Sequence, residues 1–123
     1  MDESLNVFGE PLEICCVDPV TGFYRDGKCN TNKDDVGSHT VCINVTKKFL
    51  EYSRFRGNDL STPVPEFGFK GLKEGDSWCL CAGRWLEAAE SDMAPRVHLK
   101  RTHIKALEIV PMALLKKYAV DLN

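Results

Sequence analysis

Six cysteines are the feature that most restricts what this 123-residue chain can become. Cysteine at this frequency indicates disulfides, metal ligation, thiol chemistry or plain core packing. Two of the six, Cys79 and Cys81, are separated by one residue. Residues two apart on an extended strand lie about 6.5–7 Å apart, whereas the Cβ atoms of a disulfide lie about 4 Å apart. An unbent strand therefore cannot join Cys79 to Cys81.

Length and charge narrow the class of protein. A chain of this length predicts one domain, residues 1–123, with residues 1–5 as a loose tail. Sixteen basic and 18 acidic side chains give a net charge of −2, so we expect no nucleic-acid or membrane partner. The acidic, polar start resembles no leader, and no run of 18 apolar residues follows it. We expect a cytoplasmic protein with reduced thiols.

The pattern of residues predicts an α+β fold. Residues 6–38 are rich in turn formers and are expected to be mostly loops. Residues 39–45 then alternate between apolar and more polar side chains, as a half-buried strand does. Thr46 can cap a helix over 47–56, and Gly57 can end that helix. Further patterns predict strands over 78–82 and 96–100 and helices over 84–91, over 102–107 and from Pro111 onward. We expect a small antiparallel sheet with helices packed mainly on one side.

The predicted sheet separates the cysteines from the apolar core. If the first two strands share one sheet, Val41, Ile43, Trp78 and Leu80 form its core face. Cys42, Cys79 and Cys81 then lie on the other face, which needs a cover. The loop from Gly57 or the N-terminal segment that bears Cys15 and Cys29 can provide this cover.

The long segment over 57–77 suggests a binding site. It contains Pro63, Pro65 and four glycines, too irregular for a simple connector, and we expect it to be ordered. A cavity beneath it would have aromatic walls and a few polar groups, as a small-molecule pocket requires. The polar residues expected to line it are Arg56, Asn58, Asp59, Ser61, Thr62 and Glu66. The favoured interpretation is a binding domain for a small molecule, with no cofactor expected.

The alternative interpretation uses the cysteines chemically, as a metal-dependent or thiol enzyme. His39, Cys42, Cys79 and Cys81 supply enough soft ligands for zinc, although Cys-x-Cys on a strand is unlike the usual zinc knuckle. A nucleophilic cysteine with His39 as its base is also conceivable, with Arg84 or Lys73 favouring the thiolate. The simplest interpretation remains cysteines packed as small apolar residues. Whether the chain is an enzyme stays open.

Several strings resemble those of a small family known only as domain of unknown function 2237. They include Thr21-Gly22-Phe23, Arg25-Asp26-Gly27, Gly37 to Cys42, Arg56 to Pro63 and Trp78 to Ala82. The resemblance covers about Asn6 to Asp121. It implies that Cys15, Cys29, Cys42, Cys79 and Cys81 are typical of the family, whereas Cys16 is not. That family has no assigned activity, so the resemblance implies no substrate or cofactor.

Overall fold

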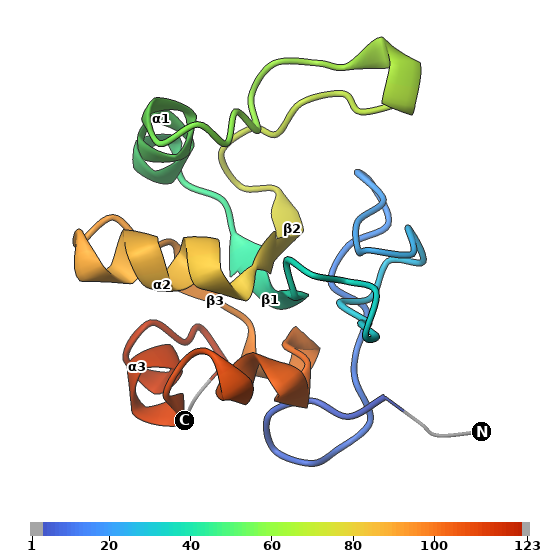
Figure 1. Cartoon of the computed structure of the whole chain (residues 1–123), viewed down its shortest axis with the longest axis vertical. Coiled ribbons are helices and arrows are strands. Elements are labelled where there is room, and N and C mark those ends of the chain that lie inside the picture. The colour runs from blue at the N-terminus through green and yellow to red at the C-terminus, as the bar shows by residue number, and fades with distance from the viewer. Residues whose placement is uncertain (1–3, 122–123) are drawn as a thin grey trace.

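A three-stranded antiparallel sheet lies at the centre of the protein (Figure 1). The computed structural model describes residues 4–121. Strand β1 (His39–Asn44) is central, between β2 (Ser77–Cys81) and β3 (Arg96–Val97). Val41 pairs with Leu80 and Ile43 with Trp78, and these four residues belong to the main core. Cys42 pairs with Cys79, and both belong to a second buried cluster. The predicted separation of the two faces is confirmed for these six residues.

The helices cover the core face of the sheet. Figure 1 shows α1 (Lys47–Phe55), α2 (Ala82–Glu90) and α3 (Met112–Lys117) on one side of it. Short 3-10 helices cover Pro65–Phe67, Leu99–Arg101 and Ile104–Glu108. Thr46 caps α1 as expected, because its Oγ1 accepts a hydrogen bond from the Phe49 amide. The α+β prediction, with helices mainly on one side, is confirmed.

The N-terminal segment covers the opposite face, where two disulfides attach it to the sheet. Cys15 is bonded to Cys42, and Cys29 is bonded to Cys79. All four side chains are buried. The expectation of reduced, merely packed cysteines is therefore wrong for these four residues. The physical reason is that cross-strand neighbours Cys42 and Cys79 present their sulfurs to the same covering segment, which carries its own two cysteines.

Two buried threonines complete the backbone hydrogen bonding around these disulfides. The Cys79 amide donates to Thr21 Oγ1 at 2.8 Å, and the Cys42 amide donates to Thr102 Oγ1 at 3.2 Å. Both threonine side chains are fully buried. The Thr21 contact matters most for the site, because it fixes the N-terminal segment against the edge strand β2.

The long segment over 57–77 is ordered by its own contacts. Val64 and Phe69 form an isolated antiparallel bridge, and the Leu72 amide donates to the Leu60 carbonyl at 2.7 Å. Gly71 is required here, because a Cβ at this position would lie 2.3 Å from the Ser61 carbonyl oxygen. Leu60 and Phe69 pack against the main core. The segment therefore lies as a fixed arm above β2.

Three local expectations need correction. The strand predicted over 96–100 ends at Val97, and the helix predicted over 102–107 is a 3-10 helix capped by His103 rather than by Thr102. Of the tail predicted over 1–5, residues 1–3 lie outside the described residues, and Leu5 is fixed because its carbonyl accepts the Ile104 amide. Within residues 4–121, no helix has the length and apolar character that crossing a membrane requires.

Candidate functional site

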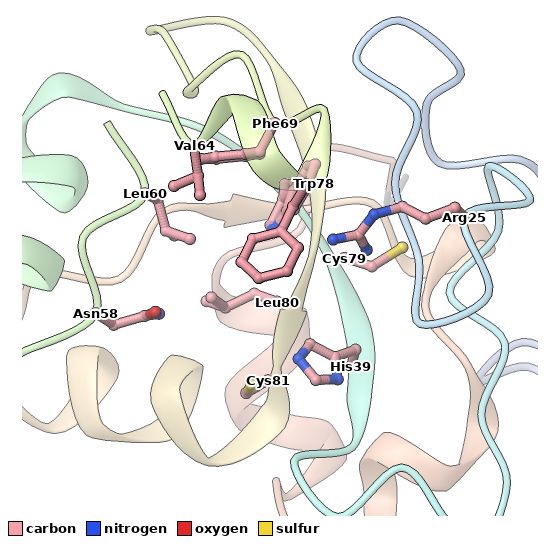
Figure 2. A pocket seen from close by; sticks show the side chains of 11 residues that line it. Arg25, His39, Asn58, Leu60, Val64, Phe69, Trp78, Cys79, Leu80 and Cys81 are labelled. Carbon is pink, nitrogen blue, oxygen red and sulfur yellow. The ribbon is translucent and has the colours of Figure 1, made fainter. Parts of the chain in front are cut away.

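A pocket of about 260 Å³ lies between the long segment and β2. Its walls are mainly apolar and come from Leu60, Val64, Phe67, Phe69, Trp78 and Leu80. Four side chains bring functional groups to it: Arg25, His39, Asn58 and Cys81 (Figure 2). The disulfide-bonded Cys79 also lines it. The pocket therefore joins three parts of the chain: the N-terminal segment, the long segment and the sheet.

Cys81 and His39 lie side by side at one end of this pocket (Figure 2). They are cross-strand partners, because β2 ends at Cys81 opposite the first residue of β1. The register shifts between His39 and Val41, so Thr40 is an extra residue in β1. Bulges of this kind redirect side chains next to functional sites. Cys81 is half-buried and forms no disulfide.

Asp35 holds the His39 ring from the side away from the pocket. Asp35 Oδ1 lies 2.6 Å from His39 Nδ1, and Asp35 Oδ2 accepts the His39 amide at 2.9 Å. The second oxygen also accepts the Thr31 hydroxyl. The Asp35 side chain is fully buried, so these hydrogen bonds fix it firmly. Phe23 stacks on the imidazole with ring centroids 6.1 Å apart.

A carboxylate only accepts hydrogen bonds, so the proton on Nδ1 of His39 points to Asp35. Nε2 is the nitrogen left to act on Cys81. Interaction with the Cys81 side chain, opposed by burial and assisted by Asp35, raises the pKa of His39 from its ordinary 6.5 to about 9. Burial raises the pKa of Asp35, but the hydrogen bonds from His39 and Thr31 outweigh it and keep that pKa below 3.8. At neutral pH the pair is an imidazolium and a carboxylate.

Cys81 also lies at the N-terminus of α2, where it is the N-cap residue. The first amide groups of a helix have no partner within the helix, and the helix dipole favours negative charge there. The Ala82 amide is not free to bind an anion, because it donates a hydrogen bond to the Ser38 carbonyl. The Gly83 amide follows in the same first turn. Cys81 thus lies beside the His39 imidazolium and at the N-terminus of a helix, although its sulfur accepts no capping hydrogen bond from α2.

Gly37 packs directly against this pair. A Cβ at this position would lie 3.1 Å from Cys81 Sγ and 3.2 Å from His39 Cε1. These distances are shorter than ordinary van der Waals contact. Glycine therefore allows the loop from Asp35 to His39 to approach the sulfur and the ring at the same time.

The pocket lies where the sequence predicts a binding site, but most of the predicted polar residues face elsewhere. Only Asn58 of the six lines it. Asp59 accepts the Ser61 and Thr62 amides and so shapes its own turn. The Arg56 side chain pairs with Glu87 on α2 at 3.2 Å. Glu66 is exposed in the 3-10 helix over Pro65–Phe67.

The predicted metal ligands are divided between two places. His39 and Cys81 lie together, whereas Cys42 and Cys79 are bonded to other cysteines and offer no thiolate. The sulfurs of Cys15, Cys29 and Cys79 lie within 4.8 Å of one another, but as disulfide atoms.

Sequence reasoning missed two members of the site, Asp35 and Arg25. Asp35 lies in the segment over 6–38 that the sequence predicts as mostly loops, and Arg25 stands out only within the family strings. The Asp35-x-x-x-His39 spacing, with Gly37 between the two residues, is a signal that could have indicated the first. No local pattern indicates the second, because Arg25 reaches the pocket through tertiary packing.

Comparison with known families agrees with the resemblance of the sequence strings. The model of a family described as an uncharacterized protein conserved in bacteria (DUF2237) matches residues 5–119. No protein with a curated description matches the chain. Because the match covers nearly the whole sequence, the chain belongs to the DUF2237 family.

Proposed function

We propose that the protein is a thiol-dependent enzyme that acts on a small molecule bound in the pocket, with Cys81 as nucleophile. The observation that carries this proposal is the arrangement of Cys81, His39 and Asp35 at one end of an apolar pocket. A nucleophile, a base beside it and a third group that orients the base are the elements of nucleophilic catalysis. Asp35 orients His39, and His39 handles the proton.

The simplest chemistry for this arrangement is acyl transfer. The Cys81 thiolate attacks a carbonyl carbon and forms a C–S bond, while negative charge develops on the carbonyl oxygen. We infer that the Gly83 amide, in the first turn of α2, donates to that oxygen. The bond to the leaving group then breaks as the His39 imidazolium gives it a proton. Water hydrolyses the thioester with His39 as base, which releases the acid and restores the ion pair.

The test is the release of p-nitrophenol from p-nitrophenyl esters of short acids. We expect a burst equal to the enzyme concentration and a mass increase of one acyl group on the peptide that contains Cys81. Cys81→Ala removes the burst, and Cys16→Ala, which removes the other free thiol, leaves it unchanged. Acylation that persists at equal rate in Cys81→Ala refutes the proposal.

Simple ligand binding is the second candidate function, and the pocket itself favours it. A binding domain needs the cavity but not the thiol. It predicts that a pocket ligand binds equally to wild type and to Cys81→Ala, and that no acyl-enzyme forms with any ester.

We further propose the cytoplasm as the location, as expected from the sequence. Disulfides are rare in that compartment. Burial of Cys15, Cys29, Cys42 and Cys79 limits the access of small reducing thiols to both bonds. Cell fractionation tests the location, since recovery outside the cytoplasmic fraction contradicts it. Trapping free thiols in acid-quenched cells tests the disulfides there: two free thiols per chain support protected disulfides, and six contradict them.

A further inference from the structure

Arg25 is held in the pocket by a backbone conformation that few side chains adopt. Its φ is +55°, in the left-handed region, and its amide and guanidinium both donate to the Gly22 carbonyl, at 3.0 and 2.6 Å. The guanidinium carbon lies 5.2 Å from the centre of the Trp78 ring. Strained residues of this kind cluster at ligand sites, since the surrounding structure must maintain them. Figure 2 shows Arg25 reaching toward Trp78, on a different side of the pocket from Cys81.

Arg25 has no acidic partner within residues 4–121. Asp18, which lines a second pocket together with Arg25, lies 4.0 Å from the Lys70 ammonium, and Asp26 accepts the Lys28 amide and the Asn30 side chain. Arg54, Arg56 and Arg84 each pair with an acid. Arg96 and Arg101, like Arg25, form no ion pair within the described residues, but they do not line the pocket. A cation beside an apolar wall, without an anion of its own chain, is suited to an anionic ligand.

The two functional ends of the pocket define the shape of the ligand. Arg25 is at one side, Cys81 with His39 is at another, and apolar side chains lie between them. Arg25 is exposed, so water partly screens a charge pair formed there. We propose that Arg25 binds a carboxylate of the substrate, so that Cys81 acts on small acids with an apolar body and an electrophilic carbon at the far end. This inference rests on the proposed function of Cys81.

The experiment measures how the charge of a thiol reagent affects its reaction with Cys81. N-iodoacetyl amino acids with spacers of increasing length are compared with their primary amides, which carry the same reactive group without charge. Rates are followed by mass spectrometry, with Cys16 as internal reference. At one spacer length we expect the acid to react about three- to tenfold faster than the amide, as one partly screened charge pair allows.

Arg25→Gln should bring the acid-to-amide ratio to about one, whereas Arg25→Lys keeps part of the preference. Arg54→Gln, which removes an equal charge on exposed α1, is the matched control and should leave the ratio unchanged. A further measurement needs no variant: hexanoate should slow the alkylation of wild-type Cys81 by neutral iodoacetamide, and hexanamide should not.

The outcomes separate the two proposals. If Cys81 reacts no faster than Cys16 with every reagent, the proposed nucleophile is wrong. If Cys81 reacts fast but the acid is never preferred, or if Arg25→Gln folds and keeps the preference, the role of Arg25 is refuted while the nucleophile stands. Equal protection by hexanoate and hexanamide also refutes it.

Discussion

Replacing His39 with glutamine should change the stability of the protein by an amount that depends on pH. The folded pKa of His39 is about 9, above the ordinary 6.5 expected in the unfolded chain. The folded state therefore holds this proton more tightly. The resulting stabilisation is fully present below pH 6.5 and is lost as pH rises through 9. At pH 6 the His39 imidazolium keeps its interactions with Cys81 and Asp35, and at pH 9.5 the ring is largely neutral and loses them.

The magnitude follows from the pKa and the exposure of the ring. A rise from 6.5 to about 9 corresponds to about 3 kcal/mol at 1.36 kcal/mol per pH unit. The His39 side chain is 37% exposed, so water screens the interaction. We therefore expect the pH-dependent part of the stability difference to be about 1–2 kcal/mol.

Urea unfolding of wild type and His39→Gln at pH 6, 7.5 and 9.5 measures this difference, with the disulfides intact. The gap in free energy of unfolding should narrow steadily as pH rises. His98→Gln is the control with the opposite sign, because burial, aided by Arg101, lowers the pKa of His98 below 6.5. His98 therefore lowers the free energy of unfolding only as pH falls below 6.5, where the unfolded chain takes up a proton more readily than the folded chain. A stability difference between wild type and His39→Gln that stays constant or widens toward pH 9.5 would refute the raised pKa of His39.

Two further predictions concern the loop beside Cys81 and the disulfides. Gly37→Ala places a methyl group 3.1 Å from the sulfur, so it should slow alkylation of Cys81 severalfold, whereas Gly83→Ala, whose Cβ meets nothing within 4 Å, should not. Iodoacetamide kinetics on both variants check this, and equal rates would contradict it. Replacing Cys29 and Cys79 together with alanine should lower the free energy of unfolding by about 4 kcal/mol, since the bond closes a loop of 50 residues. Urea unfolding measures the loss, and a change below about 1 kcal/mol would show that the bond is absent.

Much of the fold could be predicted because local rules governed it. The alternation of apolar and polar residues predicts the bounds of β1 to within one residue. The Thr46 cap and Gly57, which has a left-handed backbone conformation, predict the start and the end of α1. Local sequence patterns do not predict the structure where contacts between distant parts of the chain determine the backbone path. Beyond Val97 the chain leaves the sheet, because the Leu99 amide turns to the Asp121 carboxylate. Phe67, whose aromatic side chain is of the type expected in a core, is 84% exposed in the long segment.

The site was only partly predictable for a similar reason. The sequence predicts a site beneath the long segment, but the pairing of His39 with Cys81 depends on the extra residue Thr40 in β1, which no sequence pattern indicates. The disulfide partners do not, since Cys15 and Cys29 lie in irregular segments whose path no periodicity describes. Asp59, Ser61 and Thr62 have the residue types of a ligand site, yet they hydrogen-bond to one another within a turn. Residue type alone does not distinguish a side chain that binds a ligand from one that stabilises its own turn.

The central claim is that Cys81 is an activated nucleophile, and competitive alkylation tests it most directly. The described structure contains two free cysteines, Cys81 and Cys16, both half-buried, so Cys16 is an internal control in the same molecule. With limiting iodoacetamide at pH 6, we predict that Cys81 is modified at least tenfold faster than Cys16. In His39→Gln this advantage should disappear. Equal modification of the two cysteines in wild type, or an advantage that survives the loss of His39, would contradict the account.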